Sequence, residues 1–167
     1  MYHAKRNQLN MSIYNKNFDA HSIEKLSLVG ELRQAIKNQD FELVYQPKID
    51  LLSGAYIGVE ALTRWHHTKR GEISPCEFIP IAEQTGLINQ LTHWVLKTAI
   101  EQCKSWHKLG LNLNTSINLS AKDLHDPTLP NYLVELLSEN PACAKFITLE
   151  LTESAIMTDV KSSLKIL

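Results

Sequence analysis

Apolar and polar residues alternate along four short segments of the chain, and this period of two predicts four β-strands. The segments are residues 41–49, 56–65, 113–120 and 146–153. In the second segment, Val59 and Ala61 fall on one face, whereas Glu60 and Leu62 fall on the other. A carboxylate inside such an apolar run is costly to bury unless a cation or a hydrogen-bond donor meets it. Glu60 is therefore a candidate functional residue on this strand.

Between the strands, apolar residues recur at helical spacing. The predicted helices begin at Ser22, Ser74, Leu87, Leu129 and Thr158. Ser22 and Ser74 suit N-cap positions, and Glu77 completes a capping box with Ser74. Gly86 and Gly110 follow the predicted ends of two helices, where a left-handed residue is favoured. The apolar faces that we expect to be buried are Leu26, Val29, Leu32 and Ile36 in the first helix, and Leu133, Val134, Leu136 and Leu137 in the helix that starts at Leu129.

The first two strands are joined by a short turn at residues 51–54, which predicts an antiparallel hairpin. Placing residue 50 opposite residue 55 pairs Gln46 with Val59 and brings Gln46 to the level of Glu60. Pro47 cannot donate to a ladder, so it fits an edge or a bulge. Residues 66–71 are polar and are predicted to form a loop.

From the second strand onward, strands alternate with helices, which predicts parallel strands and an α/β fold. Glu60, Asn118 and Glu150 each lie near the C-terminal end of a strand, on the face opposite its main apolar set. In an α/β barrel such positions converge on the mouth of the active site. Two carboxylates and an amide oxygen form a hard, all-oxygen ligand set, which suits Mg²⁺ or Mn²⁺ better than zinc.

Composition limits the classes of partner. The net charge of −1 over 167 residues gives no bulk attraction to DNA or RNA, so we expect neither as a partner. No apolar run reaches the length of a membrane span. Cys76, Cys103 and Cys143 are odd in number and far apart, which fits a reducing compartment. We expect a cytoplasmic, soluble domain.

Arg64 follows Glu60 on the same predicted strand, and its guanidinium is suited to a phosphate. An acid for a metal and a base for a phosphate point to phosphodiester chemistry. A structural salt bridge between the two is the competing interpretation. His66 and His67 could form a metal pair, but side chains at neighbouring positions diverge, and we do not predict a metal pair there.

Six motifs occur in the order found in the EAL domain, and the chain resembles this family of cyclic di-GMP phosphodiesterases over residues 24–167. The motifs are Tyr45–Pro47, Glu60–Trp65, Phe78–Glu83 with Gly86–Ile88, Trp94–Leu96, Asn118–Ser120 and Glu150–Ser154. The resemblance implies a TIM-like (β/α) barrel whose first strand is antiparallel, in agreement with the hairpin predicted above.

The resemblance also implies a role for each site residue. Glu60, Asn118 and Glu150 correspond to metal ligands, with two Mg²⁺ or Mn²⁺ ions per complete site. Gln46, Leu62 and Arg64 correspond to positions that contact cyclic di-GMP, with Arg64 at a phosphate. Glu60, Glu150 and Glu153 form the catalytic set, and Glu153 holds the loop after the fourth strand. The implied reaction is hydrolysis of cyclic di-GMP to linear pGpG.

The resemblance divides the chain at about residue 21. Residues 1–21 resemble the end of a GGDEF domain, and residues 22–167 resemble the N-terminal part of an EAL domain, without its later strands and their acidic residues. A whole barrel takes about 250 residues, so we expect only its first half here and no hydrolysis by these 167 residues alone. An uncovered strand edge invites self-association, so a homodimer through the EAL domain is one expected state. A non-catalytic cyclic di-GMP-binding module and an interaction fragment stay as alternatives.

Overall fold

The structure is a computed structural model that describes residues 16–151, with side chains from residue 26 onward. Its elements are α2 (Lys16–Asn38), β1 (Phe41–Ile49), β2 (Tyr56–His67), β3 (Gly71–Ile73), α3 (Pro75–Thr85), α4 (Ile88–Lys108), β4 (Asn114–Leu119), α5 (Leu129–Glu139) and β5 (Ile147–Leu151), with short 3₁₀ turns at Asp123–His125 and Ala144–Phe146. Glu153 and the helix predicted from Thr158 lie outside the described residues, as does most of the segment that resembles a GGDEF domain.

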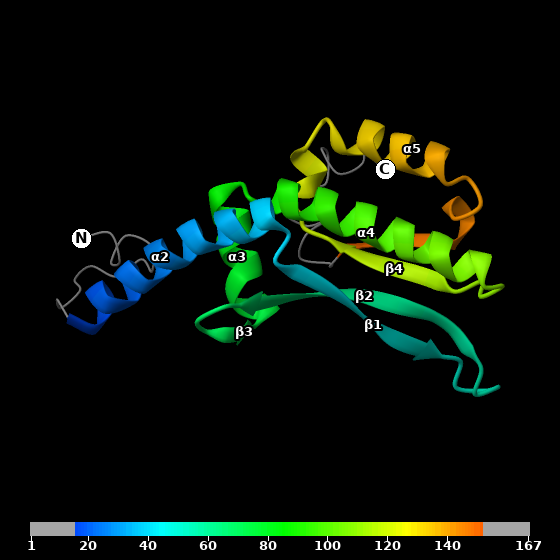
Figure 1. Ribbon diagram of the computed structural model, residues 1–167, viewed down its shortest axis with the longest axis horizontal. Helices are drawn as coiled ribbons and strands as arrows, with labels where there is room; N and C mark the ends of the chain where they lie inside the picture. Colours follow the sequence, from blue (N-terminus) through cyan, green and yellow to red (C-terminus); the bar gives the residue numbers. More distant parts are fainter. Residues whose placement is uncertain (1–15, 152–167) are drawn as a thin grey trace, which may run out of the picture.

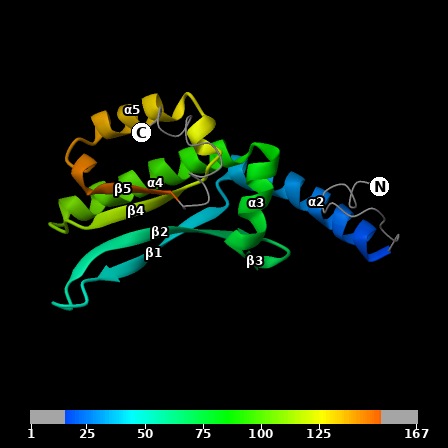
Figure 2. The same cartoon turned by 180° about the vertical axis from the view of Figure 1, so that it is seen from behind.

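The described strands form one mixed sheet in the order β1-β2-β4-β5, with β3 paired to β2. The pair β1–β2 is antiparallel, whereas β2–β4 and β4–β5 are parallel. Helix α4 lies along one face of the sheet beside β4, and α5 packs on the outer side of α4 (Figures 1 and 2). The α/β class and the antiparallel first pair are therefore confirmed.

The register of the hairpin differs by one residue from the predicted one. Gln46 is directly opposite Glu60, and the register shifts between Lys48 and Ile49. Lys48 pairs with Gly58 while Ile49 pairs with Tyr56, so the β2 residue between those two partners is left without one. A bulge inserts one such residue. Counting back from the turn without it misses the true register, although the expected proximity of Gln46 and Glu60 is confirmed.

Two predicted boundaries are wrong. Helix α2 begins at Lys16, before the expected cap at Ser22, and its buried face runs through Leu28, Leu32 and Ala35, whereas Leu26 is 73% exposed. Residues 66–71 are only partly a loop, because β2 continues through residue 67 and turns back to pair with β3. Three-residue strands give too short a pattern to be recognised in a sequence.

Helix α3 has the boundaries that its sequence predicts. Ser74 is the N-cap, and its hydroxyl accepts a hydrogen bond from the amide of Cys76 at 3.3 Å. The helix ends at Gly86, whose φ of 72° is in the left-handed region that favours glycine. This end directs the chain into α4, which begins two residues later.

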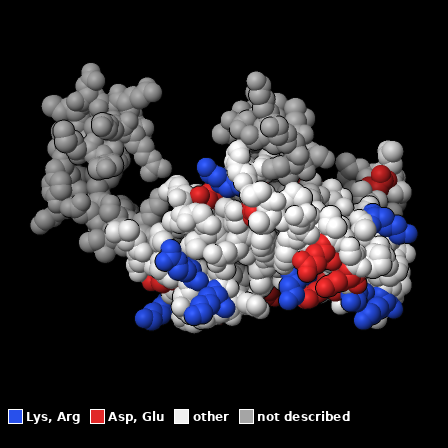
Figure 3. All heavy atoms as spheres, turned by 90° about the horizontal axis from the view of Figure 1, so that it is seen from above, with Lys and Arg blue, Asp and Glu red and all other residues white. Residues whose placement is uncertain are grey.

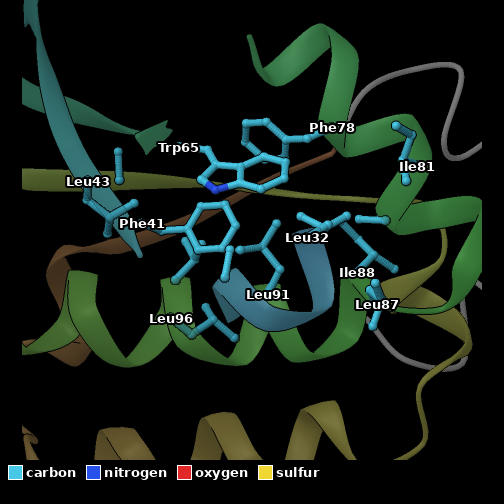
Figure 4. Packing of buried hydrophobic residues seen from close by; sticks show 14 of the residues in the cluster. Leu32, Phe41, Leu43, Trp65, Phe78, Ile81, Leu87, Ile88, Leu91 and Leu96 are labelled. Atoms are coloured by element: carbon cyan, nitrogen blue, oxygen red, sulfur yellow. The ribbon is translucent and has the colours of Figure 1, made fainter. Parts of the chain in front are cut away.

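The core lies between the sheet and helices α2, α3 and α4. Phe41, Trp65 and Phe78 meet at its centre, and the ring centroids of each pair among these three residues are 5.7 Å apart (Figure 4). Trp65 is 1% exposed. Aromatic pairs at this separation add to the burial of apolar area. On α5, Val134 is 64% exposed, contrary to prediction, because that helix contacts the core through one narrow stripe.

On the face seen in Figure 3, several acidic side chains gather in one cluster with basic side chains around it, and further basic side chains lie on the other half of that face. Within residues 16–151, no helix combines the length and the apolar character needed to cross a membrane.

Candidate functional site

Four neighbouring strands bring polar side chains to one region of the sheet. Gln46 on β1 is opposite Glu60 on β2, and Glu60 is in register with Ser116 on β4. Two residues further along β4, Asn118 is in register with Glu150 on β5. Residues i and i+2 of a strand share a face. Ser116 and Asn118 therefore stand between the two glutamates.

Glu60 and Asn118 are in direct contact. The Nδ2 amide of Asn118 donates a hydrogen bond to Oε1 of Glu60 at 2.6 Å, across 58 residues of sequence. The side chain of Asn118 is exposed and that of Glu60 is half-buried, so both are open to a ligand. The structure thus brings together two of the three residues that the sequence predicts as metal ligands.

Glu150 is held by a residue that sequence reasoning missed. The ammonium Nζ of Lys48 lies 2.5 Å from Oε1 of Glu150 and donates to Oγ of Ser116 at 2.7 Å. The hydrogen bond from Lys48 lowers the pKa of the Glu150 carboxyl, and the hydroxyl of Ser116 lowers it further. Glu150 is therefore ionised at neutral pH, as a metal ligand must be.

The chemistry of this donor set fits a hard divalent cation. Glu60 and Glu150 supply carboxylate oxygens, and Asn118 supplies an amide whose oxygen becomes available when the amide turns its NH₂ group away from Glu60. Oxygen donors of this kind suit Mg²⁺ or Mn²⁺. Among the described side chains, no group of three or more His, Cys, Asp or Glu residues is arranged so that it could hold a metal ion.

A pocket of about 460 Å³ opens beside these residues, between β2, β4, α3 and α4. Leu62 and Arg64 line it, as does Asn118, whereas Gln46 does not. On its wall, the hydroxyl of Ser120 donates to Oε1 of Glu83 at 2.6 Å. Two of the three predicted substrate-binding residues therefore share one pocket with a predicted metal ligand.

Arg64 has an acidic partner other than Glu60. Its Nε lies 3.5 Å from Oε1 of Glu72 on β3, and a terminal nitrogen donates to the carbonyl of Thr63 at 3.1 Å. The side chain of Glu72 is 57% exposed, and exposed ion pairs are weak. The guanidinium is therefore available to an anionic ligand in the pocket.

The two adjacent histidines point to different partners. His66 lies 3.0 Å from a carboxylate oxygen of Glu42 on β1, whereas His67 lies 3.4 Å from Glu31 on α2. The two side chains therefore diverge, as expected for neighbouring positions on a strand. Both side chains instead connect β2 to the elements that pack beside it.

Comparison with known proteins identifies the family of this fold. The profile of the EAL domain matches residues 29–167. A cyclic di-GMP phosphodiesterase of Pseudomonas aeruginosa is 39% identical over 150 residues, which cover 89% of this chain and 26% of the relative. The bifunctional diguanylate cyclase/cyclic di-GMP phosphodiesterase MucR of the same organism is 39% identical over 169 residues, covering 100% of this chain and 25% of MucR. The chain thus spans about a quarter of the length of these relatives.

Solved structures of EAL proteins have the same fold. The structure of the MucR phosphodiesterase in complex with c-di-GMP aligns with a TM-score of 0.79 and 40% identity over 84% of this chain and 57% of that one. The EAL enzyme Bd1971, in a form bound to cAMP and cyclic di-GMP, aligns with a TM-score of 0.79 and 28% identity over 91% of this chain and 43% of that one. The open sheet described here therefore corresponds to part of an EAL barrel, and the chain belongs to the EAL domain family.

Proposed function

We propose that this chain contributes the first part of a cyclic di-GMP phosphodiesterase site, which hydrolyses cyclic di-GMP to linear pGpG with Mg²⁺ or Mn²⁺. The observation that carries the proposal is the contact between Asn118 and Glu60, with Glu150 in register beside Asn118. These positions match the family's metal ligands, and two relatives that are each 39% identical to the chain carry this activity in their names. The three free cysteines support a site of action in the cytoplasm.

Each residue has a role that follows from its position. Glu60, Asn118 and Glu150 would hold the metal, which polarises the phosphate and lowers the pKa of a bound water when it is present. Arg64 and Leu62 line the adjacent pocket, where a guanidinium can pair with a phosphate and an apolar side chain can contact a base. Gln46 and Glu153 complete the proposed set, Gln46 as a substrate contact and Glu153 as the member of the catalytic set that holds the loop after the fourth strand in place.

We expect these 167 residues alone to produce no pGpG. They align with 57% of the chain in the MucR phosphodiesterase structure. Binding of cyclic di-GMP without turnover is the second candidate function. The observation that favours it is the ion pair between Lys48 and Glu150, which leaves one proposed ligand neutralised while Arg64 stays accessible.

Turnover can be tested by joining residues 29–151 of this chain to the remainder of the MucR phosphodiesterase domain. Chromatographic separation of cyclic di-GMP and pGpG would measure hydrolysis in the presence of Mg²⁺. We expect the joined protein to hydrolyse cyclic di-GMP, Glu60→Gln to reduce the rate by about 10²-fold or more, and the control Glu72→Gln to leave it within a factor of about three. A folded joined protein that is equally active with Glu60→Gln would contradict the proposal.

A further inference from the structure

Lys48 links the two edges of the described sheet. It lies on β1, yet its ammonium contacts Ser116 on β4 and Glu150 on β5. These partners are 68 and 102 residues away in the sequence. The side chain of Lys48 must therefore extend across β2, which separates β1 from β4 in the sheet.

Gly58 makes this crossing feasible. It is the residue of β2 in register with Lys48, and residues in register on paired strands point to the same face. Because Gly58 has no side chain, the stem of Lys48 meets no obstacle on that strand. Gln46 precedes Lys48 by two residues on β1 and so shares its face, which is the face of Glu60. The ammonium of Lys48 therefore lies within the proposed site.

Lys48 makes the net charge of the proposed site less negative. Glu60 and Glu150 bring two negative charges, and Lys48 brings one positive charge in contact with Glu150. Both members of the pair are about one-third exposed, at 35% and 36%, so water screens their interaction only in part. The number of ligand charges is one of the factors that set the affinity of oxygen sites for divalent cations.

We propose that Lys48 is the resident cation of this site, a positioning residue that holds the Glu150 carboxylate against Ser116 and weakens the binding of a divalent metal. The metal binds Glu150 in competition with the ammonium, so Lys48 sets the concentration of Mg²⁺ or Mn²⁺ at which the site fills. This inference rests on the proposed function, because it takes Glu150 as a metal ligand.

A purely structural role for Lys48 makes a different prediction. A lysine that only joins the two edges of the sheet contributes to the free energy of unfolding, and its removal leaves metal affinity unchanged or lowers it. A competing cation has the opposite effect on affinity, because its removal raises the net negative charge of the site. The sign of the change in metal affinity therefore separates the two roles.

Calorimetric titration of Mn²⁺ into the 167-residue chain tests the sign of the change in metal affinity. Lys48→Met removes the charge and the hydrogen bonds, Lys48→Gln removes the charge but keeps a donor, and Lys48→Arg keeps the charge. The matched control is Lys104→Met, which removes an exposed lysine of α4. We expect both neutral variants to bind Mn²⁺ at least about fivefold more tightly than the parent chain, and the Arg variant and the control to bind with the affinity of the parent. Circular dichroism melting of each variant shows that it is folded.

Glu150→Gln makes failure of this inference distinguishable from failure of the proposed function. If the parent binds Mn²⁺, Glu150→Gln loses that binding, and the neutral Lys48 variants bind no more tightly than the parent, the metal site stands and the role of Lys48 is overturned. Unfolding of both neutral variants would likewise assign Lys48 to the fold alone and overturn the inference. A folded parent chain that binds no Mn²⁺, or binds it equally well with Glu150→Gln, would overturn the proposed metal site and the inference together.

Discussion

Strands β2 and β4 approach each other closely at Gly58, and this close approach makes a sharp prediction about stability. Gly58 on β2 is in register with Asn114 on β4. A Cβ added to Gly58 would lie 2.5 Å from the backbone carbonyl oxygen of Asn114 and 3.1 Å from its Cβ. A backbone oxygen in a strand cannot turn aside as the end of a flexible side chain can. Gly58→Ala must therefore push β2 away from β4.

The loss of stability expected for Gly58→Ala follows from how far the distance between the added Cβ and the Asn114 carbonyl oxygen falls short of ordinary contact. Ordinary contact of a Cβ begins at 3.4 Å, so the two strands must separate by about 0.9 Å, which is 3.4 minus 2.5. Protein interiors are close-packed and yield little to such a displacement. Overpacking of this kind costs about 1–3 kcal/mol. Glu60 lies two residues along β2, so the same displacement lengthens its 2.6 Å hydrogen bond with Asn118.

Urea unfolding followed by far-ultraviolet circular dichroism measures this cost. The control is Gly30→Ala on α2, because Gly30 has open space around its missing side chain. Alanine is favoured over glycine inside a helix, so we expect the control to stabilise the chain by about 0.5–1 kcal/mol. Replacement of glycine by alanine is thus expected to lower the free energy of unfolding at position 58 and to raise it at position 30. A Gly58→Ala chain as stable as the parent would refute the reasoning.

Four further predictions concern the core, two titrating aspartates and the exposure of the thiols. Trp65→Ala removes a side chain that is 1% exposed, and we expect it to lower the free energy of urea unfolding by about 3–5 kcal/mol. Burial raises the pKa of Asp123 above that of an aspartate in the unfolded chain, so its ionisation costs stability, and the stability of Asp123→Asn relative to the parent should rise as the pH rises above about 4. The Thr128 hydroxyl lowers the pKa of Asp126. The stability of Asp126→Asn relative to the parent should therefore fall as the pH rises toward about 4, the pKa of an aspartate in the unfolded chain, and then level off. Thermal melts of the two aspartate variants and the parent at a series of pH values measure these changes. Among the three thiols, only that of Cys76 is exposed. A thiol-reactive chromophore should therefore label one thiol in the native chain and all three after unfolding. Rapid labelling of a second thiol in the native chain would contradict the burial of Cys103 and Cys143.

Sequence patterns predicted those parts of the fold that depend on neighbouring residues. The alternation in β1 gave its bounds, Phe41–Ile49, and the cap at Ser74 with the glycine at position 86 gave those of α3. The convergence of Glu60 and Asn118 also followed, because the ends of parallel strands meet at one edge of the sheet. Each of these features is encoded by residues close together in the chain or by the rules of sheet topology.

The features that were missed depend on contacts that are distant in sequence. Lys48 follows a proline near the end of β1, a position that is typical of a solvent-facing residue at a sheet edge. Its contact with Glu150 depends on the order of the strands and on the missing side chain at Gly58. The bulge beside Ile49 is a similar case, since nothing in the turn itself shows that β2 has an unpaired residue. The exposed fraction of Leu26 depends on which face of α2 packs against the core. Local periodicity does not determine such packing.

The most direct test of a cyclic di-GMP site in this chain is calorimetric titration of cyclic di-GMP into the 167-residue chain with Ca²⁺ present, which allows binding without turnover. We predict saturable binding by the parent chain and a loss of affinity of roughly tenfold or more for Arg64→Ala, because a charge-assisted contact to phosphate is removed. Glu72→Gln, which removes the acidic partner of Arg64, should keep or strengthen binding. A folded parent chain that binds no cyclic di-GMP, or binds it equally well with Arg64→Ala, would contradict the account.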